Sequence, residues 1–301
     1  MPHSVTEIIA FFQDHTFLVV AIGCAIFGIV SGVIGSFAVL RHQSLMGDGI
    51  SHAALPGIII AFLITGNRST EVLQLGALIS GLSAALLMFF VVKYSCVNFD
   101  SALALLMSVF FGLGLVLLTY SQKQPNTNRT GLSRFIYGQA AAVLRRDVVI
   151  IAVCGAIILL AITLFWKELK LFTFDAEFAQ SAGLNARWLG ALLSLMIVLT
   201  IIIGLQMVGV VLVSAMLISP AVAARQWTER LVAMVVLAAA FGAASGVIGA
   251  FVSSVAPGIP TGPTIVVSVS LIAAFSLLFS PSRGVISKTT QHMRNNTEEE
   301  S

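Results

Sequence analysis

Residues 45–57 read Leu45-Met46-Gly47-Asp48-Gly49-Ile50-Ser51-His52-Ala53-Ala54-Leu55-Pro56-Gly57. They open a long apolar segment and place a carboxylate and an imidazole within it. Asp48 and His52 are four residues apart, so on a helix they lie one turn from each other on the same face. A neutral imidazole beside a carboxylate offers two ligands to a divalent first-row metal ion. We therefore interpret the rest of the chain as a scaffold that carries this pair into a membrane.

The composition supports that interpretation. The chain has 301 residues, of which 58% are hydrophobic and 10% charged, and its mean hydropathy is +1.01. A soluble domain carries about 25% charged residues. The sequence therefore predicts a polytopic membrane protein. The net charge of +3 comes without a basic block, so nothing in the sequence indicates nucleic-acid binding.

Apolar segments long enough to span a bilayer, which takes about 20 residues, recur along the chain. They predict an all-α transmembrane bundle in a single domain over residues 1–301, with a flexible polar tail at about 283–301. The nine candidate spans lie near residues 17–40, 45–65, 71–93, 101–120, 147–166, 188–204, 206–224, 230–255 and 263–281. Gly204 interrupts the run 188–224, so this run forms either two short spans or one span and a re-entrant piece. Eight spans are the alternative to nine.

Lysine and arginine in short loops indicate which side of the membrane each loop faces. With nine spans and the N-terminus outside, the inner loops hold most of the basic residues and the basic tail. Those inner residues are Arg41, Lys93, Lys167, Lys170, Arg187, Arg225 and Arg230. The basic loop 121–146 falls outside and argues against this topology, which we retain because the other loops favour it.

Asp48 is the one acidic residue that does not lie at a loop, a terminus or the very end of a span. An ionisable residue in a membrane helix costs roughly 2.5–3.5 kcal/mol and indicates function. The alternative is that Asp48 caps the helix and His52 bonds a backbone carbonyl. Two ligands are too few for a tight site, but a twofold axis through a pore would double them. Such oxygen and nitrogen ligands suit Mn²⁺, Fe²⁺ or Zn²⁺ better than Cu⁺.

Other polar or polarisable residues near this pair and in the interrupted run are candidates for a pore lining. They are Ser51, Met207, Ser214, Met216 and Ser219. The alternative is that they are helix-packing contacts.

The segment 167–184 predicts a short helix at the membrane surface. Asp175 is suited to the N-cap, Glu177 to the first turn and Gly183 to the C′ position after the last turn. We expect a two-turn amphipathic helix on the cytoplasmic face, and spacing alone leaves open whether it docks a partner or only connects two spans.

Motifs for ATP hydrolysis and for metalloproteolysis are both absent from the sequence. None of the five lysines follows a glycine, so G-x-x-x-x-G-K-[ST] does not occur, and neither does H-E-x-x-H. A transporter of this kind must draw its energy from another polypeptide or from an ion gradient. The absence of such motifs disfavours a membrane-embedded enzyme.

Four motifs resemble the membrane permeases of bacterial ABC importers for manganese, zinc and iron. Arg41–Gly57 resembles the signature G-D-x-x-S-H-x-x-L-P-G of that family. The other three are F-D-x-E-F-A-x-S-x-G-L at Phe174–Leu184, Q-M-V-G-V-V-L-V-S-A-M-L-I-S-P-A at Gln206–Ala221, and P-T-G-P at Pro260–Pro263. The resemblance covers about residues 15–282 and implies a type II-like ABC importer permease, multi-pass in the bacterial cytoplasmic membrane.

The resemblance also implies partners and residue roles. It implies a permease that pairs with itself or with a paralogue, binds two cytoplasmic ATPases that supply the hydrolysis, and receives metal from an extracellular or periplasmic metal-binding protein. The metal passes the Asp48–His52 pair and is not held permanently. The form S-H-x-x-L-P-G is more frequent in the manganese and iron members, whereas some zinc members show A-H-x-x-L-L-G. We therefore expect manganese first, then zinc or iron. The loop helix is implied to be the coupling helix that docks into the ATPase, with the residues Asp175, Glu177, Phe178, Ala179 and Gly183. The alternative is a secondary metal transporter driven by an ion gradient.

Overall fold

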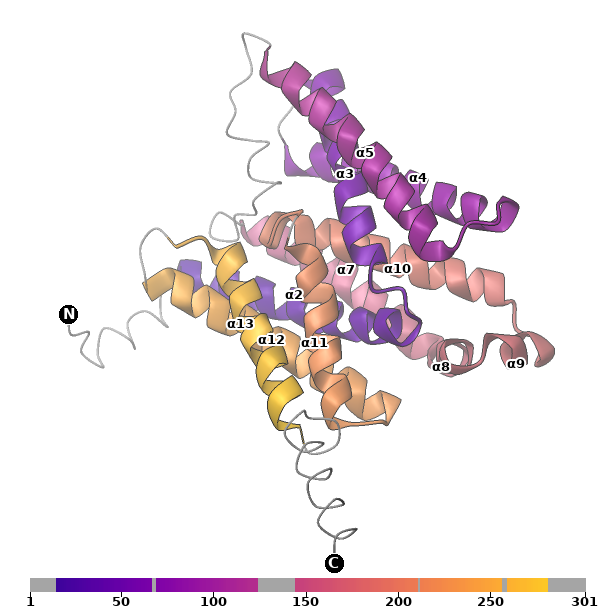
Figure 1. Cartoon of the computed structure of the whole chain (residues 1–301). Coiled ribbons are helices and arrows are strands. Elements are labelled where there is room, and N and C mark those ends of the chain that lie inside the picture. The colour runs from indigo at the N-terminus through magenta and orange to yellow at the C-terminus, as the bar shows by residue number, and fades with distance from the viewer. Residues whose placement is uncertain (1–14, 67–68, 124–143, 211, 256–258, 281–301) are drawn as a thin grey trace, which may run out of the picture.

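The computed structural model describes residues 15–66, 69–123, 144–210, 212–255 and 259–280, and the predicted polar tail lies outside these ranges. Every regular element within them is a helix (Figure 1). The helices are α2 (His15–Leu40), α3 (Met46–Thr65), α4 (Thr70–Tyr94), α5 (Phe99–Gln122), α7 (Arg145–Leu164), α8 (Trp166–Phe174), α9 (Ala176–Ser181), α10 (Ala186–Met207), α11 (Val213–Trp227), α12 (Leu231–Val255) and α13 (Thr261–Phe279).

The expected all-α membrane bundle is confirmed. Among the described residues, eight helices are long and apolar enough to cross a membrane: α2, α3, α4, α5, α7, α10, α12 and α13. The seventh predicted segment, 206–224, corresponds to α11, which has 15 residues. At 1.5 Å per residue α11 is about 22 Å long, shorter than the roughly 30 Å hydrocarbon core of a bilayer. The described chain therefore has eight helices of full spanning length and one shorter helix, α11, in the interrupted run.

The sequence analysis placed the break in the run 188–224 at Gly204. In the structure the break lies at Gly209. Gly204 is inside α10, which continues to Met207, and Gly209 takes the left-handed φ of 93° at which the chain turns. A Cβ on Gly204 would lie 2.4 Å from Cζ of Phe27 and 2.5 Å from Cγ2 of Val213. Gly204 is thus required by close packing, and a sequence pattern does not distinguish this need from a turn.

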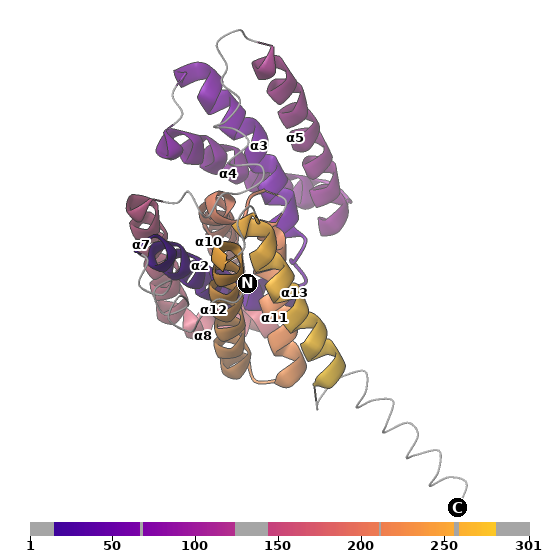
Figure 2. The same cartoon turned by 90° about the vertical axis from the view of Figure 1, so that its left-hand side faces the viewer.

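The helices form two groups (Figures 1 and 2). Helices α3, α4 and α5 pack on one another, and α2, α7, α11, α12 and α13 form the larger group, while α10 contacts both. Small residues allow the closest approaches, because a Cβ on Gly28 of α2 would lie 2.2 Å from the carbonyl oxygen of Gly242 of α12. Between α4 and α3, Ser80 Oγ donates to the carbonyl of Ala53 at 2.6 Å. These contacts are typical of membrane helices, where small and hydroxyl side chains hold the helices together.

Several connections that the sequence assigns to the inner side of the membrane lie together. The α2–α3 connection contacts α8 through Arg41 and Phe172, and Ser280 after α13 donates a hydrogen bond to the carbonyl of Gln226 in α11. The start of α12 shares a cavity with Lys170 of α8. These segments are residues 41–45, 165–185, 226–231 and the end of α13.

Candidate functional site

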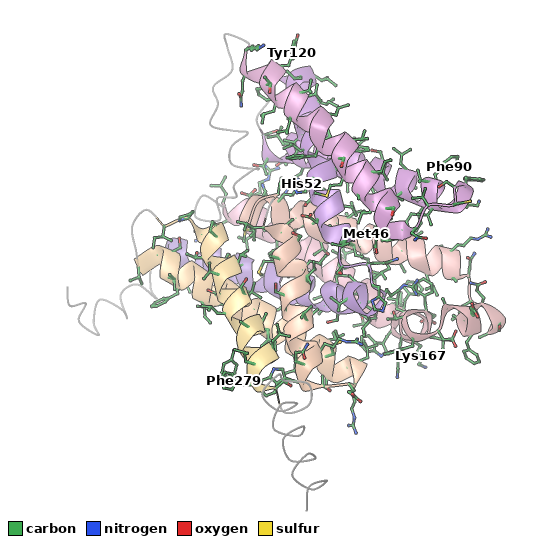
Figure 3. All side chains as sticks on the ribbon, viewed as in Figure 1. Met46, His52, Phe90, Tyr120, Lys167 and Phe279 are labelled. Atoms are coloured by element: carbon green, nitrogen blue, oxygen red, sulfur yellow. The ribbon has the colours of Figure 1, made fainter. Side chains whose placement is uncertain are left out.

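Asp48 and His52 lie one turn apart on α3, as the spacing predicts. Asp48 is in the first turn, and His52 Nε2 is 3.5 Å from Asp48 Oδ1. A hydroxyl from a distant part of the chain completes the cluster, because Ser214 of α11 donates to Asp48 Oδ1 at 3.4 Å. Figure 3 labels Met46 and His52 on α3, close to where the two groups of helices meet. The cluster therefore joins α3 of the smaller group to α11 of the larger one.

Asp48 is not the residue that caps α3. The N-cap is Leu45, and the backbone amides of Met46 and Gly47 instead donate to the carbonyls of Gln43 and Ser44, at 3.0 and 3.2 Å. A carboxylate at this position in the first turn still complements the positive end of the helix dipole. The capping alternative for Asp48 thus has no corresponding contact, and its carboxylate is left for other partners.

His52 lies in a largely apolar environment. Its side chain is 14% exposed, and its ring packs edge-on against Phe111 of α5, with the ring centroids 4.8 Å apart. Nδ1 is buried and has no hydrogen-bond partner among the described residues. The alternative in which His52 bonds a backbone carbonyl therefore has no corresponding contact either. The ring is held by packing with Nε2 toward Asp48, whose side chain is 37% exposed.

One chain provides too few ligands for a complete metal site. In the part of the chain that the structure describes, no three His, Cys, Asp or Glu residues are close enough together to hold an ion. Asp48 and His52 contribute one oxygen and one nitrogen ligand, and the Ser214 hydroxyl lies beside them. An ion at this pair would need its other ligands from water or from another polypeptide.

The five candidate pore-lining residues separate into two sets. Ser51, buried on the turn between Asp48 and His52, donates to the carbonyl of Asp48, and Ser214 contacts the carboxylate of the same residue. Ser219 is half-buried further along α11. Met207 and Met216 are fully buried in the core, and Ser245 Oγ lies 3.9 Å from Met216 Sδ. Both methionines therefore pack in the core of this chain, and the pore-lining role of all five residues stays a prediction.

The predicted short helix is present as α9, between α8 and α10. Asp175 accepts a hydrogen bond from the amide of Phe178 at 2.8 Å and is the N-cap. At the other end Gly183 has φ 84°, and the amides of Gly183 and Leu184 donate to the carbonyls of Gln180 and Ala179. This pair of bonds is a Schellman motif, which ends a helix sharply. The local prediction for Asp175 and Gly183 is confirmed.

Helix α9 lies at the surface and has one buried residue. Ala179 is fully buried, whereas Glu177 is exposed and Phe178 is 58% exposed. The neighbouring Phe174, at the end of α8, is 59% exposed. Two exposed phenylalanines beside the exposed Asp175 and Glu177 give this segment an amphipathic outer surface.

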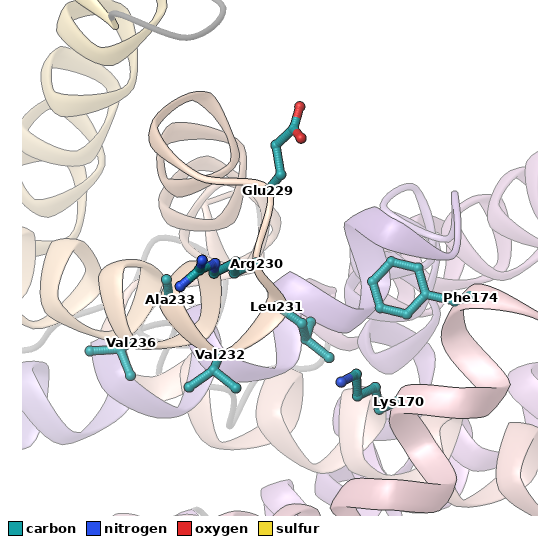
Figure 4. A pocket seen from close by; sticks show the side chains of 8 residues that line it. All are labelled: Lys170, Phe174, Glu229, Arg230, Leu231, Val232, Ala233 and Val236. Atoms are coloured by element: carbon teal, nitrogen blue, oxygen red, sulfur yellow. The ribbon is translucent and has the colours of Figure 1, made fainter.

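Beside α8 lies a cavity of about 720 Å³, which the sequence did not indicate (Figure 4). Its polar lining comes from Lys170 of α8 together with Glu229 and Arg230 before α12. Phe174 and the first turns of α12, including Val232, give its apolar lining. On this side α8 is therefore bordered by open space and not by packed side chains.

Arg41 is a second feature that the sequence analysis missed, since the positive-inside pattern gave it only a topological role. It reaches α8, where Nη1 donates to the carbonyl of Phe172 at 2.6 Å. Its place seven residues before Asp48 in the matched motif was the available signal.

Comparison with known proteins identifies the family. The sequence profile of the family described as "ABC 3 transport family" matches residues 13–280. The chain belongs to the ABC 3 transport family. The resemblance inferred from the four motifs is therefore confirmed, and this ABC 3 family protein is a multi-pass protein of the bacterial cytoplasmic membrane.

Two relatives and one solved structure illustrate the similarity of this ABC 3 family protein. The zinc transport system membrane protein TroC of Treponema pallidum is 48% identical over 275 residues, which cover 91% of this chain and 92% of TroC. The manganese transport system membrane protein MntC of Bacillus subtilis is 44% identical over 272 residues, covering 90% of this chain and 62% of MntC. The structure of PsaBC from Streptococcus pneumoniae in complex with Fab matches with a TM-score of 0.81 at 31% identity, covering 93% of this chain and 98% of that one.

Proposed function

We propose that this chain is the permease subunit of a bacterial ABC importer that moves a divalent metal ion into the cell. The observation that carries the proposal is the Asp48–His52 pair on α3 of an ABC 3 family membrane protein. The relatives named for manganese and for zinc transport support a metal cargo. The ion is a substrate in transit, so a site with few ligands suits release as well as binding.

The complete site forms when two permeases meet at a twofold axis. Each copy then supplies a carboxylate and an imidazole, and water or the Ser214 hydroxyls fill the remaining positions. Oxygen and nitrogen ligands without thiolate suit Mn²⁺, Zn²⁺ and Fe²⁺. Manganese is the first expectation from the motif S-H-x-x-L-P-G. Zinc or iron follows.

Energy comes from a separate ATPase that docks on α9. The exposed Phe178 and Glu177 face the partner, while the buried Ala179 and the capped ends hold the helix to the bundle. A metal-binding protein on the outer side delivers the ion. In this assembly the permease itself carries no catalytic residue.

The experiment is reconstitution of the permease with its ATPase and its metal-binding protein in proteoliposomes. We expect uptake of radioactive manganese that requires ATP and all three components. Uptake by the permease alone, driven by a proton or sodium gradient, would contradict the proposal and favour a secondary transporter. Competition with zinc and iron in the same vesicles ranks the three cargoes.

A further inference from the structure

Arg41 links the connection before α3 to α8, a segment 131 positions further along the chain. Its Nη1 donates to the carbonyl oxygen of Phe172 at 2.6 Å, and its guanidinium carbon lies 3.8 Å from the centroid of the Phe172 ring. One side chain thus makes a charge-assisted hydrogen bond and a cation–π contact with the same residue. Two simultaneous contacts fix both the position and the orientation of α8 relative to Arg41.

This contact differs from that of a solvated surface cation. The guanidinium is half-buried, and its Nε is buried without a hydrogen-bond partner among the described residues. Burial lowers the pKa of Arg41, because removal from water disfavours the charged form, although an arginine remains charged in proteins. Desolvating a cation is unfavourable, so this geometry indicates a dedicated contact between two segments. We call the Arg41–Phe172 contact, which connects the α2–α3 turn to α8, the joint.

A short hydrogen-bonded turn connects Arg41 to the candidate metal site. Gln43 donates from its backbone amide to the carbonyl of Ala38 at 2.8 Å, and Met46 donates to the carbonyl of Gln43 at 3.0 Å. The connection is therefore a compact hydrogen-bonded turn that leads directly into the first turn of α3. Asp48 lies in that first turn, so this turn is the only chain segment between Arg41 and the helix that carries the carboxylate.

On the other side the joint continues to the helix proposed to dock the ATPase. Phe172 is buried in α8, which ends at Phe174, and Asp175 both follows α8 and caps α9. No linker separates the two helices, so α8 and α9 move together.

The surroundings of α8 favour a hinged movement. Near the start of α8, Trp166 packs edge-on against Phe37 of α2, with centroids 5.8 Å apart. Towards α12 the cavity beside Lys170 leaves open space (Figure 4). The helix is thus held by α2 and Arg41, and the cavity leaves room between it and the start of α12.

We propose that Arg41 is a positioning residue that transmits movement of α8 and α9 to the Asp48–His52 pair. The inference rests on the proposed function, in which an ATPase moves α9 and the pair binds the ion. When nucleotide binding displaces α9, Phe172 pulls Arg41, and the turn moves the start of α3. The ligands then change position in step with the ATPase.

The transport test uses the complete complex in proteoliposomes, with the variants Arg41→Gln, Arg41→Lys and Phe172→Leu. Manganese uptake and ATP hydrolysis are measured in the same vesicles, together with manganese binding without nucleotide. We expect Arg41→Gln to keep binding and hydrolysis while uptake per ATP falls roughly fivefold or more, the lower end of coupling between two sites. Lysine keeps the charge but not the planar stack, so Arg41→Lys should rescue only partly. Lys93→Gln, which removes an exposed cation at the end of α4, is the matched control and should keep the wild-type ratio.

A second measurement does not depend on the cargo. Spin labels on residues 44 and 181, in a background without the native cysteines, report the distance between the turn and α9. In the otherwise unchanged protein we expect the same distance with and without ATP, because the joint moves as one unit. In Arg41→Gln the distance should change when ATP binds.

The outcomes separate the inference from the function on which it rests. Equal loss of uptake and hydrolysis, or loss of binding, would give Arg41 a merely structural role and overturn the inference. An unchanged ratio of uptake to hydrolysis, or an identical distance response in both proteins, would overturn it too. Failure of the unsubstituted complex to take up any metal would overturn the proposed function itself.

Discussion

Ser214 of α11 places its Oγ 3.4 Å from Oδ1 of Asp48 on α3, although 166 positions separate the two residues. Each residue lies in the first turn of its helix. Helix α11 starts after the break at Gly209. The candidate metal ligand is therefore tied to the helix that follows this break, and a shift of α11 changes the contacts of the carboxylate.

The first prediction concerns this hydroxyl. Ser214→Ala should weaken manganese binding by about fivefold, because a hydrogen bond to a carboxylate that helps to orient it contributes about 1 kcal/mol. Uptake should persist, since both proposed ligands remain. Manganese titration of the purified complex measures the affinity. Ser219→Ala on the same helix is the control, and an equal effect of both changes would assign the loss to α11 as a whole.

The second prediction concerns the proposed ligands themselves. Asp48→Asn keeps the size of the side chain and removes its charge, and His52→Gln keeps a polar group but removes the imidazole. Each should reduce manganese uptake by more than about tenfold, since losing a ligand costs at least roughly 1.4 kcal/mol of binding. Membrane insertion and association with the ATPase should be unchanged, because neither side chain caps the helix. Uptake is measured with radioactive manganese in proteoliposomes.

Wild-type uptake by Asp48→Asn would remove this carboxylate from the metal path. Its place in the first turn of α3 would then be explained by the helix dipole alone. Loss of the protein from the membrane in either variant would instead indicate a structural role for the pair.

Local features of the site could be predicted from the sequence. The Asp48–His52 spacing places two side chains on one helical face wherever that helix lies. The caps at Asp175 and Gly183 depend on residues within a few positions of each other, so they too could be predicted from the sequence. Contacts between distant segments are different. Neither the Ser214–Asp48 contact nor the Arg41–Phe172 contact follows from any spacing.

The break between α10 and α11 shows the same limit. Gly204 and Gly209 are five residues apart in an apolar run, and glycine serves both turns and close packing. Only the positions of Phe27 and Val213 against Gly204 decide which glycine does which. The burial of Met207 and Met216 likewise depends on which neighbours surround them.

The third prediction concerns docking through α9. Phe178 is 58% exposed and contributes little to the core, so Phe178→Ala should leave the permease folded while weakening its association with the ATPase. An exposed aromatic anchor at an interface typically contributes 2 kcal/mol or more, which is about 30-fold in affinity. Pull-down of the ATPase by the detergent-solubilised permease, at graded concentrations, measures the change.

Gln180→Ala is the matched control, because Gln180 is also exposed on α9 but carries no aromatic ring. Equal ATPase binding by Phe178→Ala and the unchanged protein would leave α9 as a connector. A change at the buried Ala179 tests the other face, since a bulky residue there should displace the helix and reduce uptake per ATP without preventing membrane insertion.

The last prediction concerns the contact between α2 and α12. In Gly28→Ala the new Cβ would lie 2.2 Å from the carbonyl oxygen of Gly242, so the two backbones must separate. Overpacking of this kind costs about 1–3 kcal/mol.

Gly112 in α5 is the control position. It has no neighbouring atom within 4 Å of a Cβ, and a helical glycine replaced by alanine gains about 0.5–1 kcal/mol of stability. Gly28→Ala should therefore lower the temperature at which the detergent-solubilised protein aggregates, whereas Gly112→Ala should leave it unchanged or raise it. Equal shifts in the two variants would contradict the close approach of α2 and α12, and Gly242→Ala, whose Cβ would meet the carbonyl of Gly28, should reproduce the loss.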